Sequence, residues 1–329
     1  MDSRQRFLET MSGGHPDRVP LFQEGIRDEV LEAWYKQGLP FGTDLSTLFD
    51  YDEYEDIEPN LDPIPGFRHW PTHVSELKEL RRRLNPDDPR RLPPGWREQV
   101  RLWKNRDHPL FIRVHSGFFL TLGVGDWQRF TEVIRLLVDD PGFVHQFMAI
   151  QGEFAARLVD QILHEVNVDA AVFSEPISGS HGPLISPKMY AEFVLASYAP
   201  LLDVLERHKV ATIILRTWAN SRNLLPVVFQ SGINCLWASE CGTDSLDYRR
   251  LRLEFGPKIR LVGGIDTDVL RQDKAAIQRE LEDKLPGLLS GGGFIPLADG
   301  RVREDIPFEN YCFYRKLLEE MVLTARSPR

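Results

Sequence analysis

The sequence predicts an α/β protein, a single (β/α)8 TIM barrel that spans residues 1–329. Two observations support this fold class. Short, continuously apolar runs alternate with longer segments in which apolar residues recur every three or four positions, as expected for buried parallel strands followed by amphipathic helices. The alternation occurs about eight times, which favours a closed barrel over an open doubly wound sheet. At 329 residues and 42% hydrophobic content, the chain is long enough for one such core.

The predicted strands are the uninterrupted apolar runs, because a strand buried on both faces shows no polar alternation. They are Val19–Phe22, Phe111–Val114, Ala170–Phe173, Ala211–Leu215, Asn234–Ala238, Arg260–Val262 and Phe294–Leu297. One more strand is expected between Tyr51 and Phe67, where the apolar pattern is weaker.

The predicted helices carry one apolar face at helical spacing. They cover residues 127–138, 143–162, 194–205 and 311–321, and the last follows Pro307, a residue suited to a helix start. Residues 71–110 interrupt the alternation and are rich in charge and proline. Because Trp96, Val100 and Trp103 recur there at helical spacing, we expect a helix–loop–helix excursion over one barrel mouth.

Composition narrows the class of protein. A formal net charge of −9 argues against nucleic acid as the main partner, because binding to phosphates needs a basic face. Three cysteines suit reduced thiols better than a disulfide framework. The first residues lack the apolar core of a signal peptide, and no apolar stretch approaches the ~20 residues that span a bilayer. We therefore expect a soluble, cytoplasmic protein without a membrane partner.

In a barrel of this kind the functional groups follow the carboxyl ends of the strands. Here those positions form a mixed acidic and cationic set. Its members are Glu24, Asp50, Asp52, His115, Glu175, Arg216, Trp218, Glu240, Asp266, Asp299 and Arg301.

Each of these positions has a structural alternative to a functional role. An arginine such as Arg216 at the end of an apolar strand stays charged and must find an anion, either a protein carboxylate or a substrate's. The glutamates either pair with arginines to hold loops or take part in function. His115 is either a catalyst or a satisfied barrel-end histidine. Trp218 either packs or forms a flat wall beside a planar substrate, and Asp266 is a candidate helix N-cap.

The glycine pairs and the cysteines point to no bound cofactor. Gly263-Gly264 either admits a phosphate to the backbone or makes a tight turn, and Gly291–Gly293 suits a turn into the last strand. The sequence has no P-loop, dinucleotide fingerprint or nucleophile elbow. It also has no histidine–cysteine cluster with zinc spacing. We expect neither a cofactor nor a metal.

Several short segments, taken in order, resemble the uroporphyrinogen decarboxylase superfamily. They are Arg4–Leu8, Asp17–Pro20, Phe49–Asp52, Gly182–Pro187 with Tyr190 and Phe193, Gly263–Thr267 and Gly291–Ile295. Each is weak alone, but their order and spacing are specific. The resemblance covers nearly the whole chain and implies a (β/α)8 fold and a homodimer.

The resemblance implies one of two chemistries. In the cofactor-independent decarboxylases, an arginine-rich segment after strand one binds the porphyrinogen carboxylates, and an aspartate near strand two holds the pyrrole N–H groups. Here Arg27 alone follows Gln23–Ile26, out of register, and either Asp50 or Asp52 matches the aspartate. Ala298–Gly300 stands where those enzymes carry a histidine.

The second chemistry is methyl transfer between a corrinoid protein and a thiol cofactor. In those relatives a zinc is held by a His-x-Cys pair after strand five and by a later cysteine. Arg216 and Trp218 occupy the two positions of that pair here. A guanidinium cannot ligate zinc, so a zinc-thiolate mechanism is not expected.

We therefore expect a metal-independent decarboxylase, a carboxy-lyase, that acts on a small carboxylate or a tetrapyrrole-like substrate held by arginines at the barrel mouth. The expected catalytic carboxylates are Asp52, Glu175 and Asp299, and the expected binding residues are Arg27, His115, Arg216, Trp218, Glu240 and Arg301, with Arg113 as a further cation. Two alternatives stay open: a methyltransferase without the zinc site that works with a corrinoid protein, and a non-catalytic ligand-binding barrel.

Overall fold

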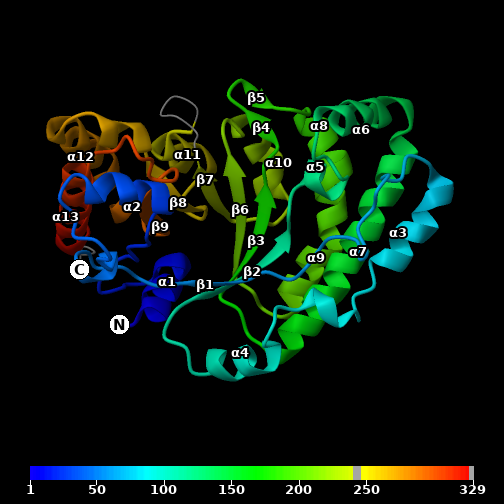
Figure 1. Ribbon diagram of the computed structural model, residues 1–329, viewed down its shortest axis with the longest axis horizontal. Helices are drawn as coiled ribbons and strands as arrows, with labels where there is room; N and C mark the ends of the chain where they lie inside the picture. Colours follow the sequence, from blue (N-terminus) through cyan, green and yellow to red (C-terminus); the bar gives the residue numbers. More distant parts are fainter. Residues whose placement is uncertain (240–245, 326–329) are drawn as a thin grey trace. The chain divides into compact units, whose positions relative to one another are not determined.

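A computed structural model describes residues 1–239 and 246–325, which belong to two compact units. The first unit comprises residues 1–55, 107–109 and those from Cys235 onward, and the second comprises residues 56–106 and 110–234. Both have the predicted α/β character, with helices between parallel strands (Figure 1). The prediction of a single domain over residues 1–329 stays a prediction.

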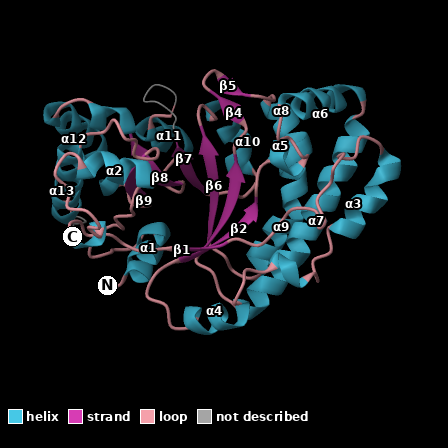
Figure 2. Cartoon of the chain, viewed as in Figure 1, coloured by secondary structure: helices cyan, strands magenta, loops and turns pink. Residues whose placement is uncertain are grey.

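The second unit is built on three parallel strands, β2 (Leu110–His115), β3 (Ala170–Glu175) and β6 (Thr212–Trp218), which lie side by side in that order (Figure 2). These confirm three of the predicted runs. The pairing of β3 with β6 is regular, with Ala170 opposite Thr212 and Glu175 opposite Thr217.

The pairing of β2 with β3 contains a shift of register. Arg113 lies opposite Val172, but His115, two residues further on, lies opposite Phe173. One residue of β2 is therefore inserted relative to β3, as in a β-bulge.

Two long helices accompany these strands, α7 (Pro141–Glu165) and α9 (Ala196–Arg207) (Figure 1). The first begins where it does because the Asp140 carboxylate accepts a hydrogen bond from the Phe143 N–H at 3.0 Å. The two helices pack at Gly152, where a Cβ atom would lie 2.2 Å from the carbonyl oxygen of Ser197. Only glycine permits backbones to approach this closely.

The excursion over residues 71–110 contains helices joined by loops, as predicted. Its elements are η2 (Val74–Glu76), α3 (Leu77–Arg83), η3 (Pro89–Arg91) and α4 (Trp96–Trp103). The buried guanidinium of Arg91 organises the loop, because it donates to the carbonyl oxygens of Asn60 at 3.0 Å, Arg83 at 2.6 Å and Asn85 at 3.1 Å.

The remaining elements of the second unit include α6, which confirms the helix predicted over residues 127–138. The others are short. In chain order, the remaining elements are α5 (Phe118–Thr121), α6 (Trp127–Asp139), β4 (Ser178–Gly179), β5 (Gly182–Pro183), α8 (Pro187–Met189), η4 (Tyr190–Leu195), η5 (Arg222–Leu224) and α10 (Leu225–Gln230). At the boundary of the units, β1 (Glu55–Ile57) confirms the strand expected between Tyr51 and Phe67.

The first unit contains three more parallel strands, β7 (Cys235–Ser239), β8 (Arg260–Ile265) and β9 (Phe294–Ala298). They confirm the last three predicted runs. Its helices are α1 (Ser3–Ser12), α2 (Asp28–Tyr35), η1 (Leu45–Thr47), α11 (Tyr248–Phe255), η6 (Thr267–Arg271), α12 (Lys274–Ser290) and α13 (Phe308–Thr324). Pro307 lies one residue before α13, as its sequence position predicted.

The prediction of a strand at Val19–Phe22 is wrong. Leu21 and Phe22 are buried, but the segment is not a β-strand. The reason is visible at Leu21, whose N–H donates to the side chain of Asp52 at 2.8 Å and whose carbonyl accepts from the Asp52 N–H at 2.9 Å. One aspartate thus satisfies backbone groups that a strand ladder would otherwise use.

Gly263 and Gly264 form neither a tight turn nor a loop for phosphate, because they lie within β8. Both have positive φ, +106° and +87°. A Cβ atom at Gly264 would lie 2.7 Å from the ring of Tyr248, which packs against this stretch and donates to the carbonyl oxygen of Val262 at 2.8 Å. The two glycines therefore make room for a buried tyrosine. Gly291–Gly293 does form the predicted turn into β9.

Among the described residues, no helix is both long enough and apolar enough to cross a membrane.

Candidate functional site

The predicted site residues fall in both units. Arg27, Asp52, Asp299 and Arg301 belong to the first unit, and His115, Glu175, Arg216 and Trp218 belong to the second. Glu240 lies outside the described residues.

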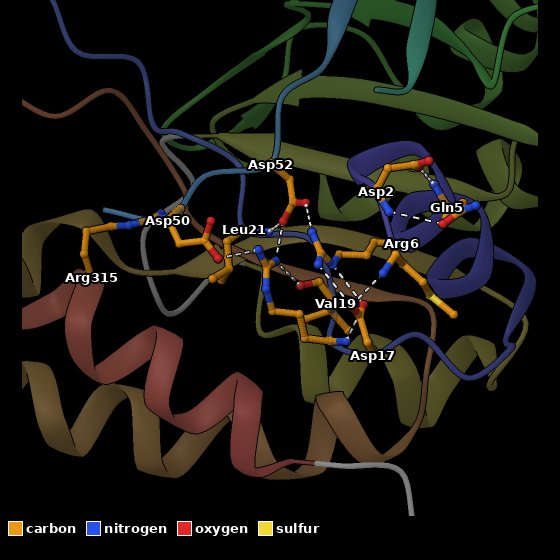
Figure 3. A network of polar contacts seen from close by, with 11 residues as sticks. Asp2, Gln5, Arg6, Asp17, Val19, Leu21, Asp50, Asp52 and Arg315 are labelled. Carbon is orange, nitrogen blue, oxygen red and sulfur yellow. Dashed lines mark hydrogen bonds and ion pairs between the residues drawn. The ribbon is translucent and has the colours of Figure 1, made fainter. Parts of the chain in front are cut away.

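In the first unit, Asp52 is fully enclosed by hydrogen-bond donors (Figure 3). Its Oδ1 accepts from Arg6 at 3.0 Å, and its Oδ2 accepts from the Leu21 N–H at 2.8 Å and from Arg18. Burial alone would raise the pKa of Asp52, but the hydrogen bonds from Leu21 and Arg18 outweigh burial and lower it. Asp52 is therefore a buried carboxylate with two cationic partners.

Asp50 and Asp52 are joined by one arginine. Arg18 donates to Asp52 and also to Asp50 Oδ2 at 2.6 Å, while the Asp50 side chain stays 52% exposed. Arg6 connects the same network to Asp17 through two hydrogen bonds of 2.9 and 3.0 Å. Neither arginine was among the predicted site residues.

Glu24 forms a second buried network in this unit. Its carboxylate accepts from the hydroxyls of Tyr311 at 2.8 Å and Tyr314 at 2.7 Å, and Arg315 lies 3.4 Å away. Burial, reinforced by the charge of Glu24, raises the pKa of both tyrosines. Tyr314 also accepts from the Ala298 N–H at 3.1 Å, so Glu24 connects its own segment with α13 and the end of β9. This geometry supports the loop-holding alternative for Glu24.

Arg27 and Arg301, predicted separately from distant segments, are brought together. The Val302 N–H donates to the Gly25 carbonyl at 3.1 Å, and a Cβ atom at Gly25 would lie 3.0 Å from Arg301 Cγ. A groove of about 430 Å³ opens beside this contact. The residues that line it are Arg27, Glu29, Val30, Arg301, Val302, Arg303 and Glu304. Its charges are three guanidinium groups and two carboxylates.

Asp299 directly follows β9, two residues before Arg301. It is half-buried, and its Oδ1 accepts from both the N–H and the hydroxyl of Thr267, at 3.2 and 3.0 Å. These two donors fix the orientation of the carboxylate. Nearby in sequence, Asp266 caps η6 by accepting from the Asp268 N–H at 2.9 Å, which confirms its N-cap alternative.

In the second unit, Glu175 and His115 lie together beneath α9. The Glu175 carboxylate is buried and accepts from the Phe118 N–H at 2.9 Å and the Tyr198 hydroxyl at 2.7 Å. His115 Nε2 is 3.5 Å from its Oε2. The cavity beside His115 and Tyr198 has about 20 Å³, which is room for a single water and not for a substrate.

Arg216 lies on the other face of the same strands. Successive strand residues point to opposite faces, and Phe173 and Glu175 both contact Tyr198 of α9. Ser174, between them, faces away, and Arg216 is its partner on β6. Arg216 and Trp218 therefore share a face that Glu175 does not. The guanidinium carbon of Arg216 lies 5.9 Å from the centre of the Trp218 ring.

Comparison with known protein families places the amino-acid sequence in one of them. The sequence model of uroporphyrinogen decarboxylase (URO-D) matches residues 67–311, which is most of the chain. The chain belongs to the uroporphyrinogen decarboxylase family.

Two curated relatives of this uroporphyrinogen decarboxylase family member have low sequence identity to it. Uroporphyrinogen decarboxylase of Pseudoalteromonas atlantica is 23% identical over 56% of this chain and 50% of the relative. The enzyme of Colwellia psychrerythraea is 23% identical over 51% and 45%. The chain thus spans about half the length of the curated relatives it matches. A solved structure of thiamine phosphate pyrophosphorylase from Pyrococcus furiosus matches 72% of this chain and 93% of that one, at 14% identity and a TM-score of 0.25.

The zinc of the methyl-transferring branch does not fit β6 of this family member. Arg216 and Trp218 share one face of the strand, where a His-x-Cys pair would offer two ligands. A guanidinium has no acceptor atom, and an indole nitrogen is a donor only. No step of the reaction is therefore assigned to a metal at this position.

The sequence did not predict the tyrosine hydroxyls that donate to the buried carboxylates. Tyr311, Tyr314 and Tyr198 were counted as apolar helix faces, although a buried tyrosine hydroxyl usually needs a partner. That need was a usable signal: each of these tyrosines donates to a glutamate at a predicted strand end.

Proposed function

We propose that this member of the uroporphyrinogen decarboxylase family is a metal-independent carboxy-lyase without a cofactor, and that Arg27 and Arg301 bind a carboxylate of its substrate. One observation carries the proposal: the two arginines, with Arg303, line one groove of about 430 Å³. Small-molecule pockets commonly have ~300–1,000 Å³. The groove suits a small carboxylic acid or one carboxylate-bearing arm of a tetrapyrrole-like molecule.

The charges of the groove support anion binding. Guanidinium groups present a planar fork of donors that matches a carboxylate. Arg27 already has a carboxylate nearby, because its Nη1 lies 3.6 Å from Glu29 Oε1, but both side chains are more than half exposed. Such exposed pairs exchange readily with other partners. A substrate carboxylate that touches two arginines at once has the advantage over Glu29.

Decarboxylation needs an anchored carboxylate and a proton donor. The bond between the substrate carbon and the leaving carboxylate breaks, carbon dioxide departs, and the electron pair left on carbon takes up a proton. We assign the donation of that proton to Asp299, which Thr267 orients at 3.0 Å and which precedes Arg301 by two residues. To Asp52 and Glu175 we assign positioning roles, because protein donors already contact both oxygens of each carboxylate.

Two further features belong to this proposal. A closed eight-stranded barrel is the architecture that we propose from family membership. A homodimer is the assembly that we propose on the same ground, and light scattering coupled to size-exclusion chromatography measures it directly.

The test uses Arg27→Gln and Arg301→Gln, singly and together. Arg250→Gln is the matched control, because Arg250 belongs to the same unit, has an 84% exposed side chain and does not line the groove. Fluorescence titration with uroporphyrin measures binding, and carbon dioxide release from uroporphyrinogen and from a panel of simple carboxylic acids measures turnover. We expect the double variant to bind roughly tenfold more weakly, and the control to bind as the unchanged protein does.

Equal binding by the double variant and the unchanged protein would contradict the role given to the groove. Tight binding with no carbon dioxide from any tested acid would favour the non-catalytic ligand-binding barrel. A corrinoid protein that co-purifies and a methylated product would favour the methyltransferase.

A further inference from the structure

An aspartate and a histidine of α7 meet a histidine at the end of α9 on the surface of the second unit. Asp160 and His164 lie one turn apart on α7, and His208 directly follows the last residue of α9. One ligand atom from each of the three lies within 4.8 Å of the others. We propose that Asp160, His164 and His208 bind a divalent transition-metal ion, with Zn²⁺ as the best match.

The donor set is the basis for this choice of ion. Imidazole nitrogens with one carboxylate oxygen suit Zn²⁺, and three protein ligands leave a fourth, tetrahedral position to water. Magnesium and calcium prefer all-oxygen surroundings, which two histidines do not offer.

The geometry is close to that of a zinc site. His208 Nε2 lies 2.7 Å from Asp160 Oδ1, and the rings of His164 and His208 meet edge to face with centroids 4.8 Å apart. Two ligands of one tetrahedral zinc stand about 3.4 Å apart, given bonds of about 2.1 Å. The hydrogen bond between His208 and Asp160 must therefore open by about 0.7 Å to admit the ion. His164, whose side chain is 67% exposed, has room to turn toward it.

A backbone carbonyl group already orients one of the three proposed ligands, His164. His164 Nδ1 contacts the carbonyl oxygen of Asp160 at 2.7 Å. A histidine that ligates a metal through one nitrogen commonly donates from the other to a backbone carbonyl, which fixes its tautomer and orientation. His164 therefore presents Nε2 to an ion.

One cation competes for the same carboxylate. Arg207 Nη1 lies 3.4 Å from Asp160 Oδ1, but its side chain is 60% exposed and can turn into solvent. An exposed ion pair of this kind contributes little to stability, so its loss does not prevent metal binding.

A metal ion at this site would cross-link α7 to the end of α9. Those helices approach each other at Gly152 and Ser197, and a metal bound at residues 160, 164 and 208 adds a second link. An ion that binds only the folded chain raises its stability by mass action. This role goes beyond the proposed decarboxylation, which uses no metal.

The experiment is a Zn²⁺ titration of the full chain, followed by calorimetry and by thermal unfolding. His208→Gln and His164→Gln remove one ligand each. His145→Gln is the control, because His145 is also on α7 and pairs with a carboxylate, Glu192 at 3.1 Å, but belongs to no three-ligand group among the described residues.

We expect one equivalent of Zn²⁺ to bind the unchanged protein and His145→Gln equally and to raise Tm for both. Loss of a second-shell contact weakens metal sites by about 10–100-fold, so each ligand variant should lose on the order of tenfold or more in affinity. It should also lose the rise in Tm. With Co²⁺ in place of Zn²⁺, the unchanged protein should show the visible absorption of a tetrahedral site. His208→Gln and His164→Gln should not show it.

No Zn²⁺ binding by the unchanged protein, or equal binding by His208→Gln and His164→Gln, would overturn the proposal. Loss of binding in His145→Gln would place the ion elsewhere on α7. Circular dichroism of each variant checks its folding, which matters most for His208→Gln because the His208 side chain is only 18% exposed. None of these results depends on decarboxylase activity.

Discussion

The buried carboxylates of this protein obtain their donors from residues far away in the sequence. Asp52 takes two arginines from the first eighteen residues, and Glu24 takes two tyrosines from α13. Each carboxylate is thereby fixed in position, since a buried charge without donors would be strongly unfavourable. At the residue scale, the buried carboxylates therefore hold together segments that are distant in the sequence.

The Asp52 network makes stability depend on pH. Its pKa is lower in the folded protein than the ordinary value of about 3.9, so its contribution is complete above that value and is lost as pH falls below about 4. We predict that Asp52→Asn is less stable than the unchanged protein at pH 7, because two arginines lose their anion, and that the difference shrinks between pH 4 and pH 3. Urea denaturation at several pH values measures both free energies of unfolding.

The exposed Asp203 on α9 provides the control for that experiment. Asp203→Asn should follow the unchanged protein at every pH. A gap between Asp52→Asn and the unchanged protein that stays constant down to pH 3 would show that Asp52 gains nothing from its ionised state.

At the scale of elements, β8 illustrates how a strand adapts to one side chain. Gly264 has φ of +87°, and a Cβ atom there would lie 2.7 Å from the ring of Tyr248. We predict that Gly264→Ala lowers the free energy of unfolding by about 2–5 kcal/mol, from backbone strain plus overpacking. Gly13→Ala tests strain alone, because Gly13 has φ of +76° and open space around it, and should lower it by about 1–2 kcal/mol. Equal losses measured by urea denaturation would mean that the Tyr248 contact is unimportant.

Elements with a strong local pattern were predictable from the sequence. The runs that became β3 and β6 are apolar on both faces, and α7 repeats its apolar residues over many turns. The failure at Val19–Phe22 has a tertiary cause, since the partner of Leu21 is the Asp52 side chain. Hydrophobic periodicity carries no information about such a partner.

The candidate site was predictable only as a set of strand-end residues. The sequence identified Arg27 and Arg301 but not Arg303, which lines the same groove. It grouped Glu175 with Arg216, although strand alternation and the β3–β6 register put them on opposite faces. The cluster at Asp160 was missed because His208 lies beyond the end of a different helix, α9. Pairings across helices and strands depend on the fold and leave no local trace in the sequence.

At the scale of the whole molecule, charge determines which macromolecules it can bind. The most basic run, Arg81–Arg83, is already paired: Arg82 and Arg83 contact Glu79 at 2.6 and 2.7 Å, and Arg81 contacts Glu153 at 3.1 Å. With a net charge of −9, we predict a Kd for a short DNA duplex weaker than ~100 μM at physiological salt. Fluorescence anisotropy measures it. Micromolar binding that weakens as salt rises would show that this run docks nucleic acid after all.

The single inserted residue in β2 allows Arg113 and His115 to face opposite sides of the sheet. Arg113 and His115 are two positions apart, a spacing that would put both on one side of an unbroken strand, yet the bulge turns the histidine toward Tyr198 while Arg113 pairs with Glu58 at 3.2 Å. Deletion of Val114 would make the two residues neighbours, and neighbours in a regular strand face opposite sides, so both side chains would keep their present directions. A relative that lacks this one residue should therefore still present the imidazole and the guanidinium on the same two faces.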